Sequence, residues 1–147
     1  MNTLVEIKDL SIGFQSQGRF NNVVHSISFN IPRGKTIAIV GESGSGKTVT
    51  ALSILKLLPY PSAFHKSGKI IFDKKNLLSL NENEMQHVRG KNITAIFQEP
   101  MTSLNPLHTV EKQINEIIML HSSTTYNQAT KKTISLLKQV GLEDITK

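Results

Sequence analysis

Eight consecutive residues have the types and the spacing needed to hold a nucleotide phosphate. Residues 41–48 read Gly-Glu-Ser-Gly-Ser-Gly-Lys-Thr, which fits the pattern G-x-x-x-x-G-K-[ST]. Its glycines lack a Cβ atom, so the backbone can approach a phosphate closely and converge its N–H groups on it. The lysine supplies a positive charge, and the threonine supplies a hydroxyl oxygen that can ligate Mg²⁺. The segment is therefore predicted to be a phosphate-binding loop, or P-loop.

Each functional position of the P-loop has a predicted role. Lys47 is expected to reach the β- and γ-phosphates of a nucleotide, and Thr48 is expected to ligate Mg²⁺. The other residues predicted to bind the nucleotide phosphates are Gly41, Ser43, Gly44, Ser45 and Gly46. The alternative is a glycine-rich turn that matches the pattern by chance. It is disfavoured because the flanking segments have the strand and helix character that the motif requires.

Two segments beside the P-loop are expected to position it. Residues 36–40 are apolar and β-branched, which is typical of a buried parallel strand. Residues 49–58 are helix-like, and the helix is expected to begin near Lys47 so that its N–H groups face the phosphate. A second buried strand is predicted over residues 92–97, directly before Gln98. Ligands of open α/β sheets lie outside the carboxyl ends of strands, so Gln98 is a candidate functional residue.

The rest of the chain alternates between strand and helix signals. Residues 4–7 and 24–29 are expected to pair as antiparallel strands, and residues 69–72 to form another strand. Three further helices are predicted from capping and amphipathic signals. The first follows a capping box at Ser79–Glu82 and runs to about Val88, and the second is marked by Val110, Ile114, Ile117 and Ile118. The third runs from a capping box at Thr125–Gln128 to Gly141. Phe14 ends the first strand region. From its position alone it is equally a core residue or an aromatic that stacks on adenine.

Composition limits the classes of protein that fit. The 147 residues include no cysteine, which excludes disulfides and thiolate metal sites. No apolar run approaches the roughly 20 residues that span a bilayer, and the first residues do not resemble a signal peptide. Any link to a membrane is therefore expected to go through a partner, without direct insertion. The net charge of +6 comes from scattered lysines, which favours solvated faces over nucleic-acid binding.

The chain resembles the ATP-binding subunits of ABC transporters nearly end to end. The likeness depends on the P-loop together with residues 96–106, Ile-Phe-Gln-Glu-Pro-Met-Thr-Ser-Leu-Asn-Pro. Residues 103–113 are most similar to oligopeptide and dipeptide importers, including the microcin C-type branch. The implied fold is α/β: a P-loop NTPase (ABC ATPase) core with an N-terminal antiparallel β-subdomain, the start of a helical subdomain and an incomplete sheet. Residues 1–98 would form the partial core and residues 99–147 the start of the helical subdomain, with the remainder of the domain absent.

The resemblance also implies roles, cofactors and partners. Phe14 falls at the position of the adenine-stacking aromatic. Gln98 falls at the glutamine that contacts Mg²⁺ and the attacking water, which makes it the catalytic candidate and a second metal ligand. Residues 99–106 would face the membrane subunit. The implied cofactors are ATP and Mg²⁺. The implied partners are transmembrane permease subunits and a second ATP-binding domain, with the chain cytoplasmic and peripheral on the inner face of the cell membrane.

The expected function is to couple ATP to peptide uptake, but the sequence departs from the family pattern. After Gln98 it contains no Leu-Ser-Gly-Gly-Gln-like signature, no apolar strand ending in Asp and Glu, and no switch histidine. This chain by itself is therefore expected to hydrolyse ATP only at background level. The alternatives are a nucleotide-binding or interaction fragment without catalysis, and a soluble ABC-type ATPase. Without later strands, residues 37–40 and 93–97 should have partly uncovered apolar faces.

Overall fold

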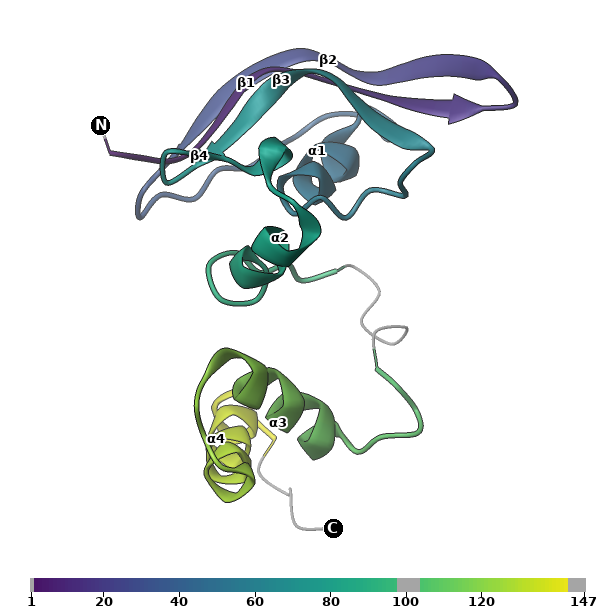
Figure 1. The fold of residues 1–147 in the computed structure, drawn as a ribbon. Coiled ribbons are helices and arrows are strands. Elements are labelled where there is room, and N and C mark those ends of the chain that lie inside the picture. The colour runs from purple at the N-terminus through teal and green to yellow at the C-terminus, as the bar shows by residue number, and fades with distance from the viewer. Residues whose placement is uncertain (1, 98–103, 143–147) are drawn as a thin grey trace. The chain divides into compact units, whose positions relative to one another are not determined.

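The computed structural model describes residues 2–97 and 104–142, and the chain forms two compact units, Met1–His87 and Val88–Lys147. The first unit is built on a four-stranded antiparallel sheet with the strand order β2-β1-β3-β4 (Figure 1). The strands are β1 (Thr3–Ser16), β2 (Arg19–Pro32), β3 (Ala63–Phe72) and β4 (Lys75–Asn76). The predicted antiparallel pair and the predicted strand at 69–72 are confirmed, and all three strands are longer than their alternating segments.

The hairpin of β1 and β2 closes through two residues, Gln17 and Gly18, which both have positive φ angles of 49° and 74°. Such backbone angles match the twist of a two-residue hairpin turn. β3 then pairs with the other side of β1, so β1 lies between two partners. Gly13 of β1 allows a close approach across this strand: a Cβ atom there would lie 2.7 Å from Cζ of Phe64.

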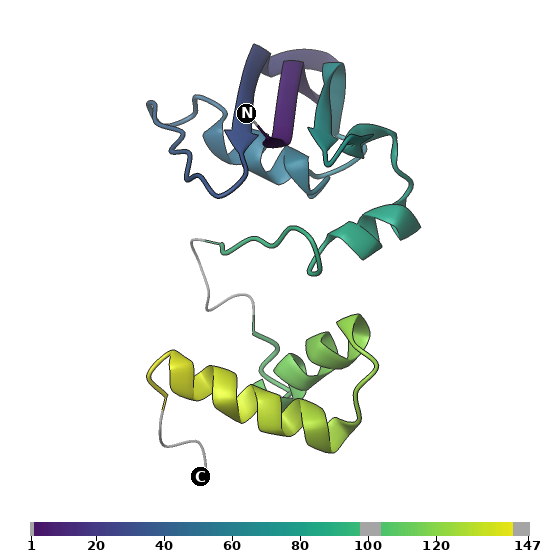
Figure 2. The ribbon, with the colours of Figure 1, turned by 90° about the vertical axis from the view of Figure 1, so that its left-hand side faces the viewer.

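Helix α1 (Lys47–Ile54) lies along one face of this sheet in Figure 1, and Figure 2 shows the same arrangement from a second direction. The 3₁₀ turn η1 (Leu77–Ser79) and helix α2 (Glu82–Val88) follow β4. Apolar residues from the strands, from the end of the α1 region, from η1 and from α2 are buried: Val5, Ile7, Leu10, Ile12, Val24, Leu55, Leu58, Ala63, Ile70, Leu77 and Met85.

The two parallel strands predicted at residues 36–40 and 92–97 are wrong in this structure. The first segment forms no strand, and Val40 is 87% exposed. The second forms a single parallel bridge, between Ile93 and Arg89, and Ile96 is fully exposed. A buried parallel strand needs neighbours on its edges and helices over its faces. The described residues supply no such neighbours here, so the apolar side chains stay uncovered, as the sequence predicts.

Helix α2 begins later than its predicted capping box. The box lies at Asn81–Glu84 instead of Ser79–Glu82. The Glu84 N–H donates to Asn81 Oδ1 at 3.0 Å, and the Asn81 N–H donates to Glu84 Oε2 at 2.8 Å. The Ser79 hydroxyl donates to the Asn76 carbonyl within η1. Both pairs have the spacing of a capping box. Ser79 belongs to the turn η1, so Asn81 caps α2 in its place.

The second unit contains helix α3 (Val110–His121) and helix α4 (Tyr126–Gln139), which pack against each other. Both helices are confirmed, as is the capping box in which Gln128 Oε1 accepts from the Thr125 N–H at 3.0 Å. Gly141 follows α4 with a φ of 84°, the usual conformation after a helix end.

The interface between α3 and α4 contains a chain of hydrogen-bonded polar side chains, two of them buried and two half-buried. Thr133 donates to Asn115 Oδ1 at 2.6 Å, and Asn115 donates to Thr130 Oγ1 at 2.8 Å. Thr130 donates in turn to Glu111 Oε1 at 2.9 Å. Asn115 and Thr133 are fully buried, while Ile117, predicted on the packed face of α3, is 57% exposed. The buried residues of α4, Ala129 and Thr133, are small and leave room for Asn115 of α3. The contact between the two helices is therefore partly polar, whereas the sequence pattern predicts an apolar one.

Candidate nucleotide-binding site

The P-loop forms a turn that leads directly into α1. The Ser45 N–H donates to the Glu42 carbonyl at 3.2 Å, which closes the turn. Gly44 and Gly46 have φ angles of 81° and 88°, in the left-handed region that side chains disfavour. A Cβ atom at Gly46 would also lie 2.9 Å from Cγ2 of Val24 in β2. The glycine at position 46 thus lets the loop pass close under the strand.

The N-terminus of α1 presents unpaired backbone donors beside this loop. Gly46 is the N-cap residue, and no side chain in the described part of the chain caps the helix. The first N–H groups of an α-helix have no acceptor within the helix, which here concerns Lys47, Thr48 and Val49. The first turn also carries no acidic side chain. This donor set, next to the positive end of the helix dipole, fits a phosphate.

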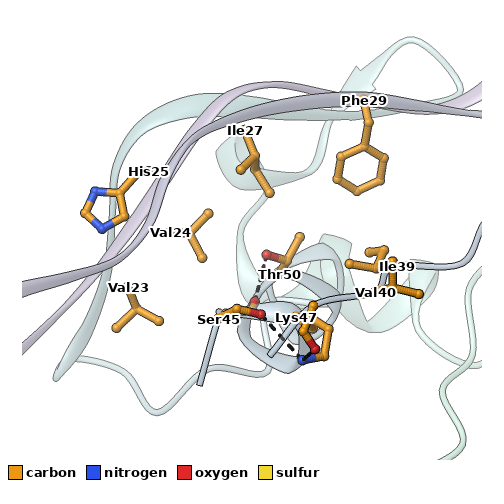
Figure 3. A pocket seen from close by; sticks show the side chains of 12 residues that line it. Val23, Val24, His25, Ile27, Phe29, Ile39, Val40, Ser45, Lys47 and Thr50 are labelled. Atoms are coloured by element: carbon orange, nitrogen blue, oxygen red, sulfur yellow. Dashed lines mark hydrogen bonds between the residues drawn. The ribbon is translucent and has the colours of Figure 1, made fainter. Parts of the chain in front are cut away.

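The side chain of Lys47 is held by its own loop (Figure 3). Its ammonium group donates to the carbonyl oxygens of Glu42 and Gly41, at 2.7 and 2.9 Å, and lies 3.4 Å from Ser45 Oγ. An ammonium group has three hydrogens, so these contacts account for its donors. The positive charge therefore lies over the loop, where the sequence predicts the β- and γ-phosphates.

A pocket of about 370 Å³ lies between β2 and the P-loop (Figure 3). One wall is formed by the β2 residues Val23, Val24, His25, Ile27 and Phe29. The other side is formed by Ile39, Val40, Gly41, Ser45, Gly46, Lys47 and Thr50. The pocket places a mainly apolar wall opposite the cation and the backbone donors. The strand pattern at 24–29 indicates these β2 residues only as strand residues, so their place in the pocket was not predicted.

The structure does not place the predicted adenine-stacking residue, Phe14, or the predicted catalytic residue, Gln98, at this pocket. Phe14 lies in β1 between Asn21 of β2 and Ala63 of β3, and it is half-buried. It is not among the residues that line the pocket. Gln98 and residues 99–103 lie outside the described residues. The roles of Phe14 and Gln98 therefore stay predictions.

Thr48 is the residue of the P-loop that the motif assigns to Mg²⁺. Within residues 2–97 and 104–142, no three His, Cys, Asp or Glu side chains lie close enough together to hold a metal ion. Mg²⁺ at nucleotide sites is usually bound by one or two protein groups, substrate phosphates and water. The exposed Thr48 at the start of α1 is compatible with that kind of site.

Comparison with known proteins decides the family. The sequence model of the protein family described as "ABC transporter" matches residues 24–147 of this chain. The chain belongs to the ABC transporter family. Among its relatives are the peptidoglycan transport ATP-binding protein YejF of Agrobacterium fabrum, 55% identical over 96% of this chain and 26% of its own length, and the oligopeptide transport ATP-binding protein OppD of Bacillus subtilis, 48% identical over 95% of this chain and 39% of its own length. The chain thus spans less than half of either relative.

Solved ABC cassettes share the fold. The dimeric ATP-binding cassette MJ0796, in a post-hydrolysis state bound to ADP and Pi, matches with a TM-score of 0.81 at 22% identity, over 95% of this chain and 58% of its own. The protein cbiO1 of Clostridium perfringens, part of the ABC transporter complex cbiONQ, matches with a TM-score of 0.68 at 20% identity, over 97% and 52%. The predicted fold class, a partial ABC ATPase with an antiparallel β-subdomain, is confirmed. No helix in the described part of this ABC family member is long and apolar enough to cross a bilayer.

Proposed function

We propose that this chain is the nucleotide-binding portion of the ATP-binding subunit of a peptide-importing ABC transporter. One observation carries the proposal: in a chain of this family, the uncapped N-terminus of α1, the turned P-loop and the Lys47 ammonium group meet in one place. Backbone donors, a helix dipole and a fixed cation together form a site for a triphosphate. The apolar wall of β2 beside them adds surface for the uncharged part of a nucleotide.

Each site residue has a proposed role in binding. Lys47 exchanges its carbonyl acceptors for oxygens of the β- and γ-phosphates, and the N–H groups of residues 41–48 bind the same phosphates. Thr48 and Gln98 would hold Mg²⁺, which when bound neutralises charge on the phosphates. Phe14 is proposed to stack on the adenine ring.

The transport role is proposed from the relatives. YejF of Agrobacterium fabrum and OppD of Bacillus subtilis are transport ATP-binding proteins for peptidoglycan and oligopeptides. We propose that this chain serves peptide uptake with transmembrane permease subunits and a second ATP-binding domain, on the inner face of the cell membrane. Residues 1–98 would serve the nucleotide and residues 99–147 would begin the helical subdomain, with residues 99–106 toward the permease.

ATP titration of the purified chain tests the proposal. Lys47→Ala should weaken ATP binding at least about tenfold, because a charged hydrogen bond contributes about 1.5–3 kcal/mol. Lys35→Ala is the matched control, since Lys35 is an exposed lysine outside the P-loop. It should leave the affinity unchanged. Equal binding by the wild-type chain and Lys47→Ala would refute the assignment of the site.

A further inference from the structure

Helix α1 makes a buried polar contact at its C-terminal end, opposite the P-loop. Ser53 is fully buried, and its Oγ lies 2.6 Å from Nε2 of His65 in β3. This hydrogen bond joins the helix that presents the phosphate donors to the sheet that it covers (Figure 1). The hydroxyl of Thr50, the other buried residue of α1, donates instead to the carbonyl of Gly46 at the N-cap of the same helix, at 2.9 Å.

The surroundings of His65 favour the neutral imidazole. Burial lowers the pKa of His65 below its ordinary value of 6.5, and the positive charge of Lys56 lowers it further. Lys56 is itself fixed nearby, because its ammonium group donates to the Leu80 carbonyl at 2.7 Å. Among the described residues, a second titratable group beside the ring is Tyr60, whose hydroxyl lies 3.4 Å from Nδ1. On the β1 side, the residue paired with His65 is the apolar Ile12.

Protonation of His65 would change the bond to Ser53. In the neutral tautomer that carries its hydrogen on Nδ1, Nε2 accepts from the Ser53 hydroxyl, and this is the tautomer that the inference assigns to His65. Both nitrogens of the imidazolium are donors. Protonation of that tautomer would turn Nε2 into a donor, so Ser53 would lose this acceptor at a site closed to water. The imidazolium would also be partly buried beside a second cation, Lys56. Both changes disfavour the docked position of α1.

We infer that His65 is a positioning residue for the P-loop: as a neutral imidazole it fixes α1 against β3 through Ser53, and acidification loosens the helix that presents the phosphate donors. The effect on ATP binding rests on the proposed function. Its direct consequence, the mobility of α1, can be measured without a nucleotide.

Amide hydrogen exchange of the purified chain, followed by mass spectrometry at about pH 7.5 and about pH 5.5, tests this. His65→Gln is the matched variant, because the glutamine amide can approximate the position of Nε2 and does not titrate. Comparing the two chains at one pH cancels the chemical effect of pH on exchange. Residues 126–139 of α4, in the other unit, provide an internal reference.

At about pH 7.5 the α1 amides of the two chains should exchange equally. At about pH 5.5 they should exchange faster in the wild-type chain by up to about tenfold, the bound set by an ordinary imidazole pKa of about 6.5. Exchange in α4 should be the same in both. Ser53→Ala should exchange faster in α1 at both pH values, with the sheet still protected.

Equal α1 exchange in the wild-type and His65→Gln chains at both pH values would overturn the inference, as would a Ser53→Ala chain that behaves like wild type at about pH 7.5. If Ser53→Ala does not fold, the comparison with His65→Gln alone decides. If glutamine replaces the imidazole poorly and raises exchange at both pH values, the decisive quantity is the additional increase on acidification, which only the wild-type chain should show. A chain that shows the expected exchange but binds no ATP would refute the proposed function and leave this inference standing.

Discussion

The ammonium nitrogen of Lys47 lies 2.7 Å from the carbonyl oxygen of Glu42, five residues earlier in the same loop. The lysine is therefore positioned by the backbone of the P-loop and not by a carboxylate. Carbonyl oxygens are weaker partners for a cation than phosphate oxygens are, since bonds between two charged groups are shorter and stronger. The geometry thus suits the proposed exchange of these carbonyl partners for phosphate oxygens.

The first prediction concerns the stability of Lys47→Ala. The hydrogen bonds of the Lys47 side chain are exposed, so water can satisfy the carbonyls of Gly41 and Glu42 that the variant leaves unpaired. The free energy of unfolding should change by no more than about 0.5 kcal/mol, the usual range for exposed positions. Thermal unfolding followed by circular dichroism measures this. A large loss of stability would mean that any loss of ATP binding reflects the fold and not the site.

The second prediction compares two glycines of the P-loop. Gly44 and Gly46 both have positive φ angles, so alanine at either position should cost about 1–2 kcal/mol. A Cβ atom at Gly44 meets nothing within 4 Å, whereas one at Gly46 meets Val24 and the Val23 carbonyl, at 2.9 and 3.1 Å. Gly46→Ala should therefore lose about 1–3 kcal/mol more than Gly44→Ala. Urea unfolding of both variants tests the difference, and equal losses would contradict the close packing of the loop against β2.

The third prediction concerns the polar chain between α3 and α4. Thr133→Val keeps the shape of the side chain but removes the donor to the fully buried Asn115. The loss should be about 1–3 kcal/mol, the cost of an unsatisfied buried polar atom. Ser135→Ala, at an exposed position of the same helix, is the control and should be nearly neutral. Adding Asn115→Leu to Thr133→Val should recover part of the loss, because it removes the unpaired amide. If Thr133→Val proves as stable as wild type, the network does not stabilise the helix pair.

The fourth prediction contrasts two isoleucines. Ile96 is fully exposed and Ile70 is fully buried in the core of the first unit. Ile96→Ser should leave the unfolding free energy nearly unchanged and raise solubility, because it removes an uncovered apolar side chain. Ile70→Ser should lose about 2–5 kcal/mol or fail to fold. Sedimentation and chemical unfolding distinguish these outcomes. A strong destabilisation by Ile96→Ser would show that residues 92–97 are covered in solution.

The fifth prediction concerns turnover. Phosphoryl transfer requires several groups that act together on the phosphates, the metal and the attacking water. The sequence after Gln98 contains no apolar strand ending in Asp and Glu. The purified chain should therefore release phosphate from ATP at the rate of the Lys47→Ala variant. Release well above that rate would contradict the expectation.

Local signals in the sequence predict the antiparallel part of the fold and the helices well. The hairpin of β1 and β2 follows from alternation on both sides of a short polar turn, and α4 follows from its capping box and its final glycine. These signals depend on neighbours in the chain. The segments 36–40 and 92–97 carry an equally clear apolar pattern, but a parallel strand depends on partners distant in sequence, and the described residues do not provide them.

The site was predictable in type but not in detail. The glycines of the P-loop and the start of α1 at Lys47 follow from the motif. The binding of Lys47 to its own loop carbonyls does not, since side-chain partners are set by three-dimensional geometry. The burial of Asn115 was also missed, because an amphipathic pattern marks apolar positions and does not detect a polar residue whose partners lie on another helix.

The pairing of β1 with both β2 and β3 has a consequence for synthesis of the chain. Of the described strands, β1 leaves the ribosome first, and it is the strand that β2 and β3 both pair with. Its hairpin with β2 can close once residue 32 has emerged, while β3 must wait until residue 72. Translation that started downstream of β1 would produce a polypeptide in which β2 and β3 have no common partner, so β1 is indispensable to this sheet.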